Sequence, residues 1–184
     1  MAGPVCAAAV ILPDDFDLSL LDDSKKLSEK RRELAMREIY LRADLWCVAW
    51  ASAAEIDEIN ILKASLLAMK RAWEGLSARL PDERPEIEVI VDGLYCPDIE
   101  VPEMRAFPRA DGTCPAVMAA SILAKTARDR MMARYDWLYP EYGYARHKGY
   151  PTQAHIEALK INGPSPIQRM TFRLKGEGQL ALFS

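Results

Sequence analysis

Short apolar runs that end at turn residues alternate along the chain with longer segments of helical periodicity. The run Cys6–Leu12 ends at Pro13 and a pair of aspartates, which predicts a buried strand followed by a turn. Ile87–Val91 is rich in β-branched residues and ends at Asp92-Gly93, which predicts a second strand. Two further segments have a strand-like composition, Trp46–Ser52 and Met104–Phe107.

The helical segments are marked by caps and by apolar residues spaced at threes and fours. Ser28 predicts an N-cap for a helix over Glu29–Ala43, and Pro115 can open a helix that continues to about Tyr135. Glu55–Arg79 has the spacing of a long amphipathic helix, with a break expected near Asn60. A polar loop is expected at Pro81–Pro85, and a short helix at Thr152–Leu159. Alternating strands and helices favour an α/β layered domain with a mixed sheet.

Length and composition limit the class of protein. At 184 residues, half of them apolar, the chain can fill one core and is too short for two ordinary domains. The sequence contains no long apolar run and no signal-like start, so we expect a cytoplasmic protein with no membrane span. Its 4 cysteines are far apart and the 2 histidines do not cluster with them, which argues against a zinc site and predicts reduced thiols.

The net charge of −3 gives no overall attraction for nucleic acid, so any binding must depend on local basic segments. Such runs are also common on solvated helix faces, and that reading stays open at this point. The basic positions are Lys25, Lys26, Lys30, Arg31 and Arg32, then Lys125, Arg128 and Arg130, then Arg146 with Lys148.

Two aspartates stand where strand ends and turns could bring them together. Asp92 closes a predicted strand, and Asp111 lies in a turn ahead of a helix. Carboxylates from two segments at one sheet edge could hold Mg²⁺ or Mn²⁺, since hard cations prefer oxygen ligands. The structural alternative is that Asp92-Gly93 is an ordinary turn and that Asp111 is a helix cap.

Eight ordered blocks, which together span almost the whole chain, resemble bacterial ribonuclease HII, the type 2 ribonuclease H. The Ala119–Lys125 and His147–Tyr150 blocks are the most distinctive of them. In chain order the blocks are Gly3–Val5, Ala7–Leu12, Asp23–Ser28, Glu55–Asp57, Val91–Gly93, Arg109–Asp111, Ala119–Lys125 and His147–Tyr150. A type 3 ribonuclease H fits less well, because the Glu55–Asp57 block with Asn60-Ile61 and the C-terminal tail suit type 2 better.

The resemblance implies a ribonuclease H-like mixed β-sheet flanked by helices, with a C-terminal helical part. The implied activity is endonucleolytic hydrolysis of the RNA strand of RNA–DNA hybrids, including ribonucleotides embedded in duplex DNA, with two divalent ions, Mn²⁺ or Mg²⁺. Asp92 and Asp111 match catalytic, metal-binding aspartates of the family. Tyr150 matches the tyrosine that packs against the ribose. Ser24, Lys25 and Lys148 are the implied contacts to the nucleic-acid backbone.

One motif implied by the resemblance, Asp-Glu-x-Gly-Arg-Gly on the first strand, is absent from these 184 residues. We expect that the recorded sequence starts inside the gene, so that most of this central strand is missing and its neighbours have unpaired edges. On this expectation, the polypeptide alone is inactive and poorly soluble. The alternative function is a catalytically inactive protein that binds the hybrid or the sliding clamp.

The sequence predicts a catalytic domain over residues 1–174 and a flexible tail over 175–184. Within the tail, Gln179, Leu180, Leu182 and Phe183 resemble the peptide by which bacterial repair proteins bind the sliding clamp. The alternative is that these apolar residues pack on the domain itself. We expect a monomer whose partners are the nucleic acid and, through this tail, the clamp.

Overall fold

The computed structural model describes residues 1–81 and 87–172. It is an α/β fold, as the alternation of patterns predicts, and each expected strand and long helix is present within a few residues of its expected bounds. Most of the expected loop at Pro81–Pro85 and all of the expected tail at 175–184 lie outside the described residues. None of the described helices is both long and apolar enough to span a membrane.

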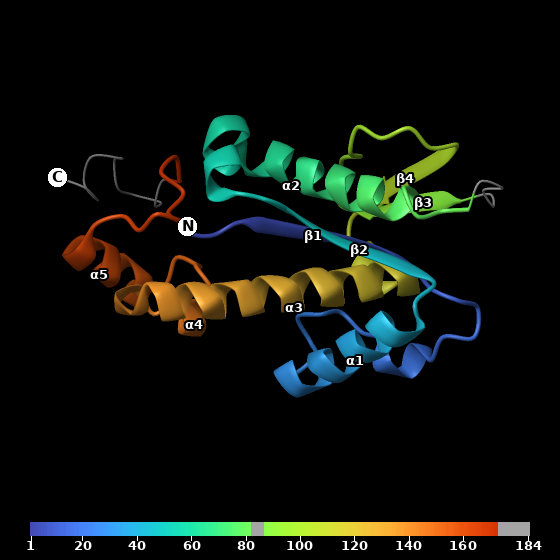
Figure 1. The fold of residues 1–184 in the computed structure, drawn as a ribbon, viewed down its shortest axis with the longest axis horizontal. Helices are drawn as coiled ribbons and strands as arrows, with labels where there is room; N and C mark the ends of the chain where they lie inside the picture. The colour runs from blue at the N-terminus through green and yellow to red at the C-terminus, as the bar shows by residue number, and fades with distance from the viewer. Residues whose placement is uncertain (82–86, 173–184) are drawn as a thin grey trace. The chain divides into compact units, whose positions relative to one another are not determined.

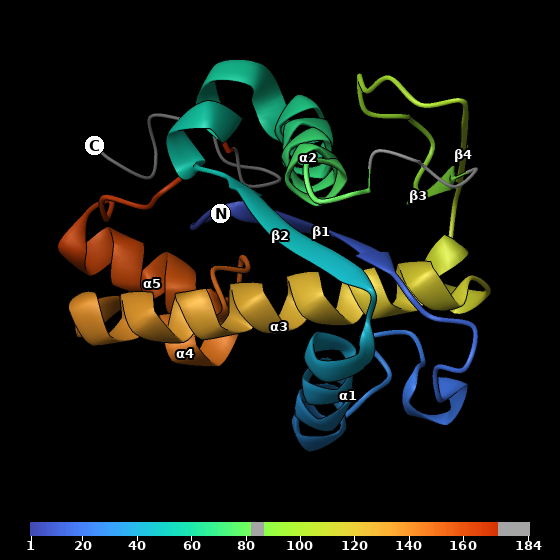
Figure 2. The same ribbon diagram turned by 45° about the vertical axis from the view of Figure 1, so that its right-hand side comes forward.

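The four described strands form two separate two-stranded sheets (Figures 1 and 2). Strand β1 (Val5–Ile11) pairs with β2 (Leu45–Ala51). Strand β3 (Glu88–Asp92) runs parallel to β4 (Glu103–Phe107), with Asp92 opposite Phe107. Among the described residues, two separate two-stranded sheets therefore stand in place of the single mixed sheet that was expected.

Helix boundaries follow local hydrogen bonding. The Ser28 hydroxyl accepts from the backbone N–H of Arg31 and begins α1 (Glu29–Arg42), as its sequence position predicts. Helix α2 (Ala53–Ser77) is interrupted at Asn60, where φ is 70° and ψ is 166°. The Asn60 side chain accepts from the N–H groups of Leu62 and Lys63, so it caps the second part of the helix. The expected break near Asn60 is confirmed.

The remaining helices follow the last strand. Helix α3 (Pro115–Leu138) begins at Pro115, as expected, and continues slightly beyond the expected end. The loop that follows contains a 3₁₀ turn, η3 (Pro140–Tyr142), and one short helical turn, α4 (Tyr144–His147). Thr152 caps α5 (Gln153–Asn162) by accepting from the N–H of His155.

The chain divides into two compact units, each with its own apolar core. Among the described residues, the first unit comprises 1–5, 51–64 and 128–172, and the second comprises 6–50, 65–81 and 87–127. The core of the first unit includes Met132, Tyr144 and Leu159. The core of the second unit includes Ile39 of α1 and Ile122 of α3.

An apolar cavity of about 270 Å³ lies inside the second unit, between β1 and β3. Consecutive residues of both strands line it, which means that the backbone edges of the two strands face the same space. Helix α2 contributes Met69 and Trp73 to its wall, and α3 contributes Val117 and Ala120. The run Cys6–Leu12 was expected to be a buried strand, but Ala7 is its only fully buried residue, because this strand lines the cavity.

Candidate metal and nucleic-acid site

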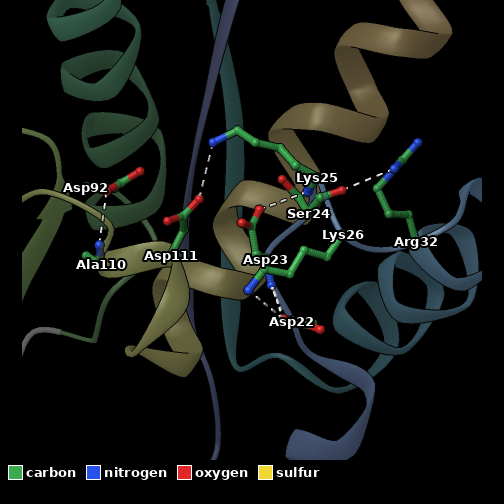
Figure 3. A network of polar contacts seen from close by, with 9 residues as sticks. All are labelled: Asp22, Asp23, Ser24, Lys25, Lys26, Arg32, Asp92, Ala110 and Asp111. Atoms are coloured by element: carbon green, nitrogen blue, oxygen red, sulfur yellow. Dashed lines mark hydrogen bonds and ion pairs between the residues drawn. The ribbon is translucent and has the colours of Figure 1, made fainter.

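The two aspartates singled out by the sequence lie in one hydrogen-bonded arrangement within the second unit (Figure 3). Asp92 is the last residue of β3, and its Oδ1 atom accepts from the N–H of Ala110 at 3.0 Å. Asp111 follows directly, within the 3₁₀ turn η2 (Ala110–Gly112), and is only 7% exposed. The carboxylate of one aspartate is therefore bonded to the residue that precedes the other.

Arg109 makes the turn into η2 possible. Its φ of 64° places it in the left-handed region, which non-glycine residues adopt uncommonly. Gly112 donates its N–H to the Arg109 carbonyl oxygen at 3.0 Å, which closes the turn around Asp111. The backbone thus orients Asp111 before the small-residue face of α3 begins.

Lys25 faces Asp111 from a different part of the second unit. Its Nζ atom lies 3.7 Å from Asp111 Oδ2, and its side chain is 77% exposed. The exposed ammonium group offsets part of the negative charge of a carboxylate that is nearly buried. The neighbouring Ser24 is only 4% exposed, so Lys25 is the residue of this pair whose side chain reaches solvent.

The loop that carries Lys25 is fixed by its own polar groups (Figure 3). The Asp23 carboxylate accepts from the backbone N–H of Lys25 at 2.9 Å. Arg32 of α1 donates to the carbonyl oxygens of Ser24 at 3.1 Å and Leu27 at 2.6 Å. In the sequence, Arg32 belongs to a basic segment that could bind nucleic acid or form a solvated helix face. Its supporting role is not visible there, because a run of basic residues does not show which of them turns back onto the chain.

Asp92 and Asp111 supply the oxygen ligands that a hard divalent cation prefers. Across the described ranges, however, no group of three or more His, Cys, Asp or Glu side chains is placed to hold a metal ion. The chemistry of these two carboxylates fits a divalent ion, whereas a pair of such ions needs additional negative charge to offset their mutual repulsion.

Tyr150 and Lys148, the other proposed contacts to nucleic acid, lie in the first unit. Tyr150 is 54% exposed, and the guanidinium carbon of Arg128 lies 5.3 Å from its ring centroid. Lys148 has a φ of 50° and ends α4 in the left-handed conformation. The convergence of these residues with Asp92 and Asp111 stays a prediction.

A buried histidine holds the backbone of Tyr150. His155 Nδ1 donates to the Tyr150 carbonyl oxygen at 3.0 Å, and the His155 ring stacks on His147 with centroids 4.4 Å apart. Burial lowers the pKa of His155 to about 4, so the ring is neutral at pH 7. Both histidines therefore have structural contacts here.

Asp57, part of one of the family-like blocks, anchors a distant segment of the first unit. Its carboxylate accepts from the N–H groups of Met170 at 2.7 Å and Thr171 at 2.9 Å, and from the Thr171 hydroxyl at 2.6 Å. Burial alone would raise the pKa of Asp57, but these hydrogen bonds outweigh it and the pKa is lowered. Nothing in the sequence shows this pairing, because its partners are more than a hundred residues away.

The proposed clamp-binding residues Gln179, Leu180, Leu182 and Phe183 lie outside the described residues. Their role stays a prediction.

Comparison with known sequences gives one consistent result. The family model described as "Ribonuclease HII" matches residues 1–175. A ribonuclease HII of Treponema denticola is 55% identical to the chain, over 95% of this chain and 93% of that protein. A ribonuclease HII of Desulforamulus reducens is 48% identical, over 91% of this chain and 81% of that protein.

Solved structures show the same likeness. The ribonuclease H2 of Pyrococcus horikoshii superposes with a TM-score of 0.67 at 26% identity, covering 93% of this chain and 87% of that one. The structure of the PCNA:RNase HII complex from Archaeoglobus fulgidus gives a TM-score of 0.65 at 27% identity, covering 92% and 86%. Bst-RNase HIII in complex with Mn²⁺ gives 0.68 at 16% identity, covering 88% and 58%, which is a likeness of fold alone.

Proposed function

The chain belongs to the ribonuclease HII family and is thus a ribonuclease H-type endoribonuclease, and we propose that it cleaves the RNA strand of RNA–DNA hybrids and ribonucleotides embedded in duplex DNA with the help of two divalent ions. The observation that carries this proposal is the arrangement of Asp92 and Asp111, joined through the N–H of Ala110. Their match to the metal-binding aspartates of the family gives these two carboxylates their proposed role.

The chain's own residues have distinct roles in this proposal. Asp92 and Asp111 hold the ions, and the backbone of η2 keeps Asp111 oriented. Lys25 offers an exposed ammonium group beside this pair, where it can contact a phosphate of the nucleic acid. Bound Mn²⁺ or Mg²⁺ would supply Lewis-acid polarisation of the phosphate and activation of water. A protein of the same fold, Bst-RNase HIII, has been solved with Mn²⁺, which supports the choice of a divalent ion.

Tyr150 and Lys148 complete the proposed substrate contacts. The half-exposed ring of Tyr150 is suited to pack against a sugar or a base. Lys148 and Ser24 are proposed to contact the sugar-phosphate backbone of the nucleic acid. The 2′-hydroxyl is the group that lets such a site distinguish RNA from DNA.

The remaining negative charge is proposed to come from the Asp-Glu-x-Gly-Arg-Gly motif, which these 184 residues do not contain. An extended segment that carries this motif can pair with β1 on one side and β3 on the other, because both strands direct an edge into the cavity between them. Asp92 also lines this cavity, so acids on the added strand would lie beside it. Without that segment, the second candidate function is hybrid binding without catalysis, which is favoured by the lack of any group of three or more candidate metal ligands in the described ranges.

A cleavage assay with an added peptide tests the proposal. The purified chain is incubated with Mn²⁺ and a labelled hybrid, alone and with a peptide that carries the motif. We expect no cleavage by the chain alone and cleavage of the RNA strand when the peptide is present. A matched peptide with Asn-Gln in place of Asp-Glu should fill the cavity and restore no activity. Cleavage by the chain alone would refute the need for the motif, and no cleavage with either peptide would favour the binding protein.

The C-terminal residues Gln179, Leu180, Leu182 and Phe183 are proposed to bind the bacterial sliding clamp. A structural relative was solved as a PCNA:RNase HII complex, which supports clamp binding. Removal of residues 179–184 should abolish binding of the chain to purified clamp in a pull-down, while binding of the hybrid is retained. Unchanged clamp binding after this deletion would contradict the assignment.

A further inference from the structure

The carboxylate of Asp111 has a positively charged partner within its own unit. The Nζ atom of Lys25 lies 3.7 Å from Asp111 Oδ2 (Figure 3). The side chain of Asp111 is only 10% exposed, whereas that of Lys25 is 77% exposed. Across residues 1–81 and 87–172, this carboxylate makes no other hydrogen bond or ion pair. Lys25 therefore compensates a charge that is nearly removed from water, where an uncompensated charge is costly.

The main chain of Lys25 is fixed, but charge alone keeps its ammonium group beside Asp111. The backbone N–H of Lys25 donates to the Asp23 carboxylate at 2.9 Å, and Arg32 donates to the carbonyl oxygen of Ser24 at 3.1 Å. The 3.7 Å between the ammonium nitrogen and Asp111 Oδ2 is longer than a hydrogen bond. A lysine stem is flexible, so the ammonium group can leave Asp111 while the loop that carries it stays in place.

The ammonium group stands where it would repel a divalent ion on the same carboxylate. An ion held by Asp111 Oδ2 at about 2.1 Å would lie within about 6 Å of the Lys25 nitrogen in its present position. Cations so close together repel each other, and water screens this repulsion less beside a nearly buried group than between fully exposed charges. Binding of the ion therefore favours departure of the ammonium group.

We propose that Lys25 and the divalent ion are alternative partners of Asp111, and that binding of the ion releases the ammonium group to a phosphate of the nucleic acid. The inference rests on the proposed function, since Asp111 is there given the ion. Lys25 then weakens ion binding while nucleic acid is absent. Because coupling between two ligands is reciprocal, the ion strengthens binding of the nucleic acid through the same side chain.

Lys26 provides a matched control. It is the next residue along the chain, and its side chain is 68% exposed. Its Nζ atom lies 4.0 Å from Oδ1 of Asp22, which is not a proposed ligand of the ion. Lys25→Gln and Lys26→Gln each remove one positive charge from the same loop. A general effect of net charge therefore predicts the same change in ion binding for both variants.

A titration with Mn²⁺ alone tests the first part of the proposal. Binding to the purified chain is followed through the EPR signal of free Mn²⁺, so the readout needs neither nucleic acid nor activity. The parent is compared with the single variants Lys25→Gln, Lys25→Arg and Lys26→Gln. The same three substitutions are then measured in the Asp111→Asn background.

We expect Lys25→Gln to tighten Mn²⁺ binding by about threefold, which is the size of an exposed ion pair. Lys26→Gln and the charge-conserving Lys25→Arg should bind with close to the parental affinity. The gain from Lys25→Gln should disappear in the Asp111→Asn background. Parental affinity for Lys25→Gln, an equal gain from Lys26→Gln or Lys25→Arg, or a gain that persists without the Asp111 carboxylate would overturn the inference.

The second part concerns release to a phosphate. Affinity for a labelled RNA–DNA hybrid is measured by fluorescence anisotropy with EDTA and with Ca²⁺, which also prefers oxygen ligands. Screening of phosphates by Ca²⁺ acts equally on Lys25→Gln and Lys26→Gln, so the comparison between them isolates the released side chain. Ca²⁺ should favour hybrid binding more in Lys26→Gln than in Lys25→Gln. An equal effect of Ca²⁺ on both variants would refute the release.

The titrations also distinguish failure of this inference from failure of the proposed function. Mn²⁺ binding that Asp111→Asn does not weaken in any variant would count against Asp111 as a ligand, and so against the proposed function. Binding that requires Asp111 but is unaffected by Lys25→Gln would refute the inference alone. The absence of Mn²⁺ binding in the parent and in every variant would refute both.

Discussion

Among single residues, Asp57 shows most directly how a polar side chain stabilises the fold. Its carboxylate accepts three hydrogen bonds from Met170 and Thr171. Asp57→Asn keeps the size of the side chain but loses the charge, and we expect the free energy of unfolding at pH 7 to fall by about 1–2 kcal/mol. Urea unfolding measures the loss.

The pH dependence of this effect follows from the lowered pKa of Asp57. Its contribution is fully present above the pKa of an unfolded aspartate, about 3.9, and is lost as the pH falls through the lower folded pKa. The difference between parent and Asp57→Asn should therefore shrink in acid. Asp98→Asn, which removes an exposed partner of Lys70, is the control and should leave the free energy of unfolding nearly unchanged, because solvent screens such a pair. Equal losses from both substitutions would contradict the anchoring role.

The stability of the protein should also depend on pH through His155, in a pH range above that of Asp57. Burial lowers its pKa to about 4, whereas the unfolded chain has an ordinary histidine with a pKa of about 6.5. The neutral ring is favoured in the folded state, so this group has no effect on stability above about pH 6.5 and reduces stability as the pH falls toward 4. An NMR titration of the His155 ring should give a depressed pKa, and an ordinary value would contradict its burial.

The sequence predicted Asp92 and Asp111 as metal-binding partners; the structure bonds Asp92 to the residue before Asp111, and the role of the two carboxylates as ligands stays a prediction. The sequence did not predict the residues that support them. Arg32 reaches back to the Ser24 and Leu27 carbonyl oxygens, and Arg109 adopts a left-handed turn. Such roles depend on backbone geometry and on contacts made only after folding, so residue type and spacing do not show them.

At the scale of elements, the break in α2 is the most specific local feature. The sequence predicted it near Asn60, and the structure shows why the residue is suited to the position. Its side chain caps the following helix, while its φ of 70° and ψ of 166° lie in a region that favours glycine.

Two substitutions at Asn60 separate the cap from the backbone strain. Asn60→Ala loses the cap and keeps a Cβ at positive φ, so we expect a loss of about 1–2 kcal/mol in the free energy of unfolding. Asn60→Gly also loses the cap but removes the steric cost, so its loss should be smaller, a few tenths of a kcal/mol. Denaturant unfolding of both variants gives the comparison. A larger loss for glycine than for alanine would show that the break is not maintained in solution.

The strands show that the apolar pattern of a sequence predicts where strands lie but not how they pair. Every expected strand is present, but their pairing into two separate sheets was not visible in the apolar pattern. Pairing depends on which edges meet, and an apolar run contains no information about its neighbours. The half-burial of β1 follows from the cavity it lines and not from its composition.

At the scale of the molecule, the α/β class followed from the alternation of strand and helix patterns, and the family followed from the ordered blocks along the sequence. The two compact units did not, because each of them is assembled from segments far apart in the chain. The central claim of the proposed function is that Asp92 and Asp111 act together in holding the ions that cleave RNA.

The most direct measurement of that claim is the rate of RNA-strand cleavage, with Mn²⁺ and the motif peptide, for Asp92→Asn, Asp111→Asn and the control Asp98→Asn. The account predicts that each of the first two substitutions lowers the rate by at least about 100-fold, since even the loss of groups that only orient a metal ligand costs 10–100-fold. Asp98→Asn should cleave at the parental rate. Parental rates for Asp92→Asn or Asp111→Asn would contradict the account.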